Sequence, residues 1–173
     1  MQMMSLPAHL EIHFLTETPS FDDAVEAMAD EAFGPGRFAR AASRVREMAP
    51  HDRSLSFVAV RHGELVGSVR QTRVMVGARP AVMLGPLAVR PACKGKGVGR
   101  ALMALAADAA REAGEEVIFL VGDRAYYMPL GYSPLPRGSL RMPGPVDEAR
   151  ILALALRPGA LEGLEGPVGP RLT

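Results

Sequence analysis

The sequence predicts an α/β fold whose sheet mixes antiparallel and parallel strands. Three extended apolar segments, 55–60, 65–76 and 81–89, are separated by short turns that contain glycine, and 65–76 is rich in β-branched residues. This pattern is typical of an antiparallel meander. A helical segment then connects the third of these strands to an apolar strand at 115–121. Such a connection implies a parallel pair of strands with a right-handed crossover.

Two helices are predicted before the meander. A short apolar stretch at 12–15 is a first strand, and Ser20, three residues before Asp23, is a candidate N-cap for the first helix. The glycines and proline at 34–36 end that helix. A second helix, which ends before Pro50, is indicated by apolar residues at helical spacing: Phe38, Ala41, Val45 and Met48.

The remaining elements follow a glycine-rich loop. We expect a helix that ends at Gly114, a short helix at 124–130 that ends at Gly131, and a last strand at 151–156. Pro86 lies inside the third meander strand and removes a hydrogen-bond donor, so it indicates an edge strand or a bulge. We expect one domain over residues 1–173, in which 157–173 is an irregular tail.

Composition excludes several classes of function. The chain has 20 Lys plus Arg against 19 Asp plus Glu, so its net charge of +1 gives no general field for nucleic acid or an anionic membrane. The four histidines and Cys93 lack the spacing of a zinc site, and one cysteine cannot form an internal disulfide. No secretory signal pattern or apolar run of 18 residues is present. We therefore expect a cytoplasmic protein without a metal.

The loop between the third meander strand and the next helix has the features of a phosphate cradle. Glycines at 95, 97 and 99 allow positive φ angles and close approach of a ligand to the backbone. The loop leads into a helix N-terminus, where free N–H groups favour an anion. Lys94, Lys96 and Arg100 add positive charge. A solvated turn before the helix is the simpler interpretation of the same residues.

Two familiar phosphate sites do not fit this loop. A nucleotide-binding P-loop requires a Gly-Lys pair followed by Ser or Thr, whose hydroxyl binds magnesium. The segment Gly97-Val98-Gly99-Arg100 offers no such hydroxyl. The dinucleotide motif requires GxGxxG, whereas this loop has GxGxG and follows a meander rather than a first strand.

The loop resembles the acetyl-CoA motif of the GNAT superfamily of N-acetyltransferases. That motif is Arg or Gln, two residues, Gly, one residue, and Gly or Ala; Lys94, Gly97 and Gly99 match it, with Lys in the first position. The preceding segment 84–91 is similar to the family's bulged fourth strand. A second segment, 122–132, resembles a later signature in which a tyrosine precedes Gly-Phe. Tyr127 takes that position.

The resemblance covers roughly residues 57–163, and the closing segment 156–163 is similar to that of one branch of bacterial N-acetyltransferases. It implies a GNAT-like acyl-CoA N-acyltransferase domain whose central, mostly antiparallel sheet is splayed between its fourth and fifth strands. It also implies that acetyl-CoA is the cosubstrate and that the acetyl group passes directly to a primary amine of a small molecule or peptide. A homodimer is a general expectation for such enzymes.

The resemblance also assigns roles to residues. Tyr127 is the expected general acid, and a bulge near Leu87 and Ala88 is expected to direct a backbone N–H, such as that of Leu87, at the thioester oxygen. Cys93 is expected to be an ordinary thiol. The expected coenzyme-binding residues are Leu87, Ala88, Val89, Lys94, Gly95, Lys96, Gly97, Val98, Gly99, Arg100, Ala101 and Tyr126.

The general base and the acceptor are not fixed by the sequence. A lysine-like amine is almost fully protonated at pH 7, so a base or a water relay is needed. Four residues are candidates: Glu31, His51, Asp52 and Asp123. A non-catalytic module that binds acetyl-CoA and an acyltransferase for longer acyl chains are the alternative functions.

Overall fold

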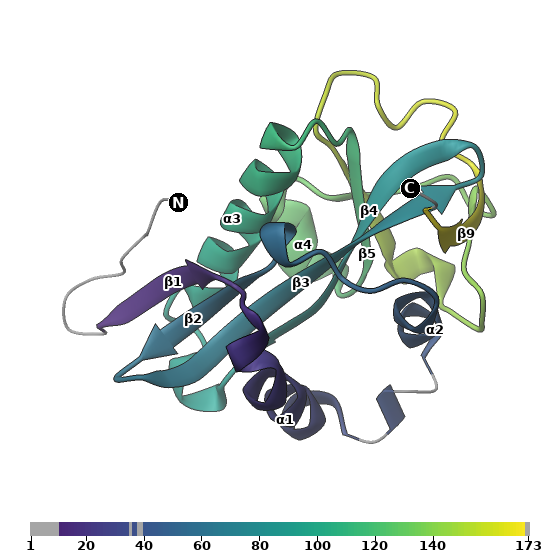
Figure 1. Ribbon diagram of the computed structural model, residues 1–173. Helices are drawn as coiled ribbons and strands as arrows, with labels where there is room; N and C mark the ends of the chain where they lie inside the picture. Colours follow the sequence, from purple (N-terminus) through teal and green to yellow (C-terminus); the bar gives the residue numbers. More distant parts are fainter. Residues whose placement is uncertain (1–10, 35, 38–39, 172–173) are drawn as a thin grey trace.

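The computed structural model describes residues 11–34, 36–37 and 40–171. One mixed sheet of nine strands forms the centre of the molecule, and helices cover both of its faces (Figure 1). The strands are β1 (Ile12–Thr16), β2 (Phe57–Arg61), β3 (Glu64–Val76), β4 (Arg79–Val89), β5 (Val117–Val121), β6 (Ser133–Pro134), β7 (Leu140–Arg141), β8 (Ile151–Ala155) and β9 (Gly166–Pro170). The α-helices are α1 (Asp22–Phe33), α2 (Ala41–Met48), α3 (Val98–Glu112) and α4 (Arg124–Tyr127).

The order of the strands confirms the expected meander and crossover. The main path is β1-β2-β3-β4-β5-β8-β6, in which β1 to β4 are antiparallel neighbours. Strands β4 and β5 are parallel, and they pair only through Val82↔Ile118 and Met83↔Phe119. The two strands therefore diverge beyond Met83, which gives the splayed sheet that the resemblance implied.

Strand β4 contains the bulge that Pro86 indicated. Val69 pairs with Leu87 and Gln71 with Leu84, so Arg70 alone lies opposite both Gly85 and Pro86. The strand is interior rather than an edge. The bulge lies at 85–86 and not near Leu87 and Ala88, because the register with β3 resumes at Leu87. The expected position of the bulge was wrong by about two residues.

The bulge reverses which face each side chain of β4 occupies. Before it, Val82 and Leu84 belong to the core cluster under α3. After it, Leu87 and Val89 pack against that same cluster, whereas Ala88 packs with residues of α1. One extra residue in a strand with a period of two changes the facing in this way.

Helix α3 lies on one face of the sheet, and α1 and α2 lie on the other (Figure 1). Gly67 of β3 permits the close packing of α3, since a β carbon there would be 3.1 Å from both Val98 and Leu102. The buried side chain of Gln71 donates hydrogen bonds to the carbonyls of Leu55 and Ala106 at 2.7 and 3.0 Å. These contacts fix the helix that follows the glycine loop.

Two terminal expectations were wrong. Phe21, rather than Ser20, is the N-cap of α1, because a 3-10 turn at Pro19–Phe21 precedes the helix. The segment 157–173 is not wholly irregular, since β9 pairs with β3 and β7. Phe38, expected in the second helix, lies outside the described residues.

The 3-10 helices are Pro19–Phe21, Arg53–Leu55, Pro91–Cys93, Met128–Leu130 and Glu148–Arg150.

Arg171, the residue that follows β9, stabilises the sheet near the place where β4 and β5 are still paired. Arg171 donates a hydrogen bond of 2.6 Å to the carbonyl of Ala81, one residue before the parallel pairing begins. It also forms a two-point ion pair with the buried carboxylate of Glu115, at 2.8 and 2.9 Å. None of the helices in the described ranges is long and apolar enough to cross a membrane.

Candidate active site

A cavity of about 1150 Å³ is lined by β4, the glycine loop, the first turn of α3, the end of β5 and α4. Most of the residues that the sequence singled out meet there: Leu87, Ala88, Val89, Lys94, Gly95, Gly97, Val98, Gly99, Arg100, Tyr126 and Tyr127. Two do not line it. Lys96 is exposed, and Ala101 is buried in the core cluster under α3.

The glycine loop has the backbone of an anion cradle. Gly95 and Gly97 have φ angles of 77° and 85°, which residues with a β carbon rarely adopt. Gly97 is the N-cap of α3, and the first bond of the helix runs from the N–H of Ala101 to the carbonyl of Gly97 at 3.0 Å. The N–H groups of residues 98–100 therefore have no acceptor within the helix. Loop, helix end and cationic side chains fit a pyrophosphate.

The free side of β4 forms a second part of the cavity. Beyond Met83, the described residues place no strand next to β4 on its β5 side. Backbone N–H and C=O groups along 84–89 on that side can therefore pair with an extended amide-containing ligand, as an added strand would. Leu87 and Val89, which line the cavity, lie in this segment.

Two tyrosines of α4 close the cavity. Asp123 caps this helix by accepting a hydrogen bond from the N–H of Ala125 at 3.0 Å. The rings of Tyr126 and Tyr127 meet edge to face, with their centroids 4.7 Å apart. The hydroxyl of Tyr126 lies over the first turn of α3, where a β carbon on Gly99 would be 2.5 Å from it. The phenol of Tyr126 thus lies at the first turn of α3, and Tyr127 lines the same cavity from beside Gly122.

Tyr127 is suited to donate a proton. Burial raises the pKa of its phenol to about 12; the neighbouring Tyr126 and Asp123 add to the increase and Arg150 opposes it. The phenol is therefore protonated throughout the neutral range. An edge contact with the ring of Tyr132 holds the other side of the Tyr127 ring.

The four candidate bases lie in different surroundings. Glu31 is exposed and forms an ion pair with Arg90 at 3.0 Å, and Asp52 accepts bonds from Ser54 and Arg73. Neither lines a described cavity. Asp123 lines the large cavity, and His51 lines a smaller one of about 230 Å³ that shares Arg37, Arg46 and Pro86 with it. Of the four candidates, His51 and Asp123 are the two that line these cavities.

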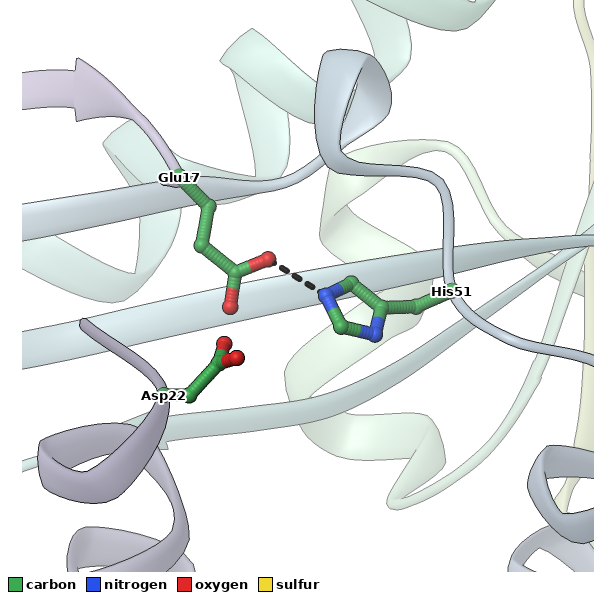
Figure 2. Close-up of side chains that lie close together, drawn as sticks. All are labelled: Glu17, Asp22 and His51. Carbon is green, nitrogen blue, oxygen red and sulfur yellow. Dashed lines mark hydrogen bonds and ion pairs between the residues drawn. The ribbon is translucent and has the colours of Figure 1, made fainter. Parts of the chain in front are cut away.

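Sequence reasoning missed the ion-pair network behind His51. The Nε2 atom of His51 is 2.6 Å from a carboxylate oxygen of Glu17, and the carboxylate of Asp22 faces the same space (Figure 2). The atoms of these three side chains that could bind a metal ion, one per residue, lie within 4.8 Å of one another. Arg70 already bonds to Glu17 and Asp22, and Arg53 binds Asp22 at two points of 2.8 Å. We therefore interpret the cluster as a network of ion pairs.

The network affects the pKa of Glu17. Burial alone would raise it, but hydrogen bonds from His51 and Arg70 lower the pKa below the usual 4.5. Arg70 was the available signal, because a charged residue in the middle of a buried strand requires a partner. Its location opposite the bulge in β4 connects the network to the cavity wall.

The fold of this chain is similar to the folds of known proteins. An E. coli GNAT family N-acetyltransferase, YhbS, solved in complex with CoA, is 26% identical, with a TM-score of 0.79 over 97% of this chain and 93% of that one. A GNAT family acetyltransferase from Brucella melitensis, solved in complex with acetyl-CoA, is 24% identical, with a TM-score of 0.68 over 94% and 97% of the two chains. No curated protein sequence matches significantly. The sequence model of the acetyltransferase (GNAT) family matches residues 22–132. The chain therefore belongs to the GNAT family of acetyltransferases.

Proposed function

We propose that this protein transfers the acetyl group of acetyl-CoA directly to a primary amine of a small molecule or peptide. The observation that carries the proposal is the meeting, in one cavity, of the glycine cradle, the unpaired side of β4 and the phenol of Tyr127. The complexes of the two similar acetyltransferases with CoA and acetyl-CoA support the choice of cosubstrate.

The loop and β4 would hold the two ends of the coenzyme. The N–H groups of residues 98–100, with Lys94 and Arg100, would bind the pyrophosphate. Backbone groups of Leu87, Ala88 and Val89 would pair with the amides of the pantetheine arm. Lys96 is exposed and would add charge near the phosphates, whereas Ala101 would contribute only as part of the first helical turn.

The reaction requires two hydrogen-bond or proton donors, one for the carbonyl oxygen of the thioester and one for the departing sulfur. The amine nitrogen attacks the thioester carbon, a C–N bond forms and the C–S bond breaks. The N–H of Leu87 would stabilise the negative charge that develops on the carbonyl oxygen. The hydroxyl of Tyr127, which is protonated at neutral pH, would give its proton to the departing sulfur.

A proton must also leave the amine. We assign its removal to His51 or Asp123, directly or through water, because these two candidates line the cavities. The variants His51→Gln and Asp123→Asn separate the two choices, and Asn preserves the cap of α4. The base is the residue whose loss removes the acidic limb of the pH profile of kcat/KM; unchanged profiles in both variants would leave water as the acceptor.

Titration calorimetry with acetyl-CoA tests the proposal. We expect micromolar binding to the wild type and none to Gly97→Glu, whose carboxylate would enter the cradle. Gly63→Glu is the matched control, since Gly63 also has a positive φ and open space around it but lies in the β2–β3 turn. Absence of binding to the wild type would refute the proposal.

Two measurements separate the alternatives. Release of free thiol in the presence of an amine panel distinguishes an enzyme from a non-catalytic module that only binds acetyl-CoA. Comparison of acetyl-CoA with longer acyl-CoA thioesters establishes the acyl preference. A cytoplasmic location and a homodimer remain predictions, which cell fractionation and sedimentation can test.

A further inference from the structure

Arg46 of α2 is a half-buried cation at the boundary of the two cavities. Its side chain lines both the large cavity and the small one. One guanidinium nitrogen, Nη1, is 3.6 Å from where a β carbon on Gly85 would lie, so it reaches the bulge of β4. The other, Nη2, donates a hydrogen bond to the hydroxyl of Ser43 at 3.3 Å. Arg46 therefore lies next to the strand that would hold the acyl end of the coenzyme.

The carboxylates of Glu26 and Asp30 are bound by other arginines. Arg37 pairs with Glu26 at 2.7 Å and with Asp30 at 3.0 Å. Arg70 pairs with Glu26 as well, at 3.0 Å. Within the described part of the chain, no carboxylate comes within ion-pair distance of Arg46. A cationic side chain is thus left without an anion in the wall of a cavity.

More cations than anions act on the guanidinium of Arg46. Burial lowers the pKa of its guanidinium to about 10, and the nearby cations Arg37, Arg70 and Arg40 oppose its charge while Glu26 supports it. The side chain still carries its charge at neutral pH. An anion bound at this place would offset both the lost hydration and the repulsion.

The geometry points to an acceptor that carries a carboxylate beside its amine, and we propose that Arg46 binds this carboxylate. The inference rests on the proposed function and names the substrate class of the same site. The coenzyme phosphates have their own cations, Lys94 and Arg100, at the glycine loop. Arg46 instead extends from α2 to the bulge of β4 at Gly85. Its planar guanidinium can donate two parallel hydrogen bonds to a carboxylate.

Matched pairs of amines test the substrate class. Each amino acid is compared with the amine that lacks its carboxylate, such as lysine with 1,5-diaminopentane and phenylalanine with phenethylamine. For at least one pair we expect the wild type to prefer the carboxylate-bearing member by about 10- to 100-fold in kcat/KM. In Arg46→Met the preference should disappear, with the decarboxylated amine within about twofold of its wild-type value.

Arg44→Met is the matched control, because Arg44 is exposed on the same helix and lines neither cavity. It should keep the preference. Arg46→Lys should keep the charge but lose most of the preference, since it lacks the two-point fork. Thermal unfolding of each variant checks that α2 is intact. Equal or better use of the decarboxylated amine by the wild type in every pair would overturn the inference.

A binding measurement keeps this inference separate from the proposed function. The N-acetyl derivatives of the standard amino acids, and N-alkylacetamides without the carboxylate, are titrated into the protein in the absence of coenzyme. We expect at least one acid to bind, with binding lost in Arg46→Met and retained in Arg44→Met. If no acid binds the wild type, the carboxylate site is absent and the inference is wrong. Failure to bind acetyl-CoA while an acid still binds would refute the proposed function and leave the carboxylate site at Arg46 in place.

Discussion

The ring of Tyr127 lies directly against the backbone of Gly122, at the place where any other residue would carry its β carbon. A β carbon there would overlap the Cε2 atom of the ring, and it would also be 2.8 Å from Cδ2. The backbone of Gly122 is not in the left-handed region, so the glycine is required by space and not by its φ angle. The end of β5 thus sets the position of the proposed acid.

Gly122→Ala should displace the Tyr127 ring. We expect a loss of about 1–3 kcal/mol in the free energy of unfolding, as for other overpacked sites. The fall in kcat should be larger than the change in acetyl-CoA affinity. Urea unfolding and steady-state kinetics measure the two effects. Gly36→Ala, where the added carbon meets open space, should change neither; a normal kcat in Gly122→Ala would show that the ring position does not matter.

Tyr127→Phe removes only the phenol hydroxyl. We expect kcat to fall by about 100-fold while the Kd for acetyl-CoA stays within about twofold, because the hydroxyl would act on the departing sulfur. Rapid-quench kinetics and calorimetry provide the two numbers. Tyr132→Phe is the control, since the buried hydroxyl of Tyr132 has no hydrogen-bond partner among the described residues. An undiminished kcat in Tyr127→Phe would assign the ring to packing alone.

Gly99→Ala tests the contact between the first turn of α3 and Tyr126. Alanine should favour the helix by up to about 1 kcal/mol, but its methyl group would push the Tyr126 hydroxyl away. We expect unchanged or higher stability together with acetyl-CoA binding weakened about tenfold, or about 1.4 kcal/mol. Tyr126→Phe in the same chain should relieve the crowding and recover part of the affinity. If Gly99→Ala binds acetyl-CoA with full affinity, Tyr126 does not contribute to the coenzyme site.

Glu17→Gln should destabilise the protein most at neutral pH. The folded state lowers the pKa of Glu17, so its contribution is present above the usual 4.5 and is lost as the pH falls through the lowered value. Loss of this buried charge leaves Arg70 with fewer partners and should cost about 2–4 kcal/mol at pH 7. Urea unfolding at pH 7 and below pH 4 should show the difference shrink. The exposed Glu64→Gln should have little effect at either pH, and an equal loss for Glu17→Gln at both would contradict the assignment.

Local chemistry made much of the site predictable. Gly95 and Gly97 take the positive φ angles that their place before a helix indicated, and the parallel crossover from β4 to β5 follows from the helix between them. Each of these signals lies within a few residues of the structure it predicts. Tyr127 required the resemblance, because a tyrosine in a short helix has no pattern of its own that distinguishes an acid from a packing residue.

The missed features depend on contacts between distant segments. Glu17 and Arg70 are 53 residues apart, and nothing near either residue shows that they meet. β9 has two prolines and two glycines in five residues, a composition that argues against a strand. It forms because the end of β3 offers it a partner over 74–76. The position of the bulge in β4 likewise depends on the register with β3.

The bonds of Arg171 to the carbonyl of Ala81 and to the carboxylate of Glu115 have a consequence for biosynthesis. Arg171 is 90 residues downstream of Ala81, so a ribosome has long finished β4 and β5 before it adds this residue. A domain generally folds as a unit, so it completes its structure only after the ribosome has released all of its segments. We therefore expect a ribosome-bound chain that stops before Arg171 to capture acetyl-CoA poorly, and the released chain to capture it well.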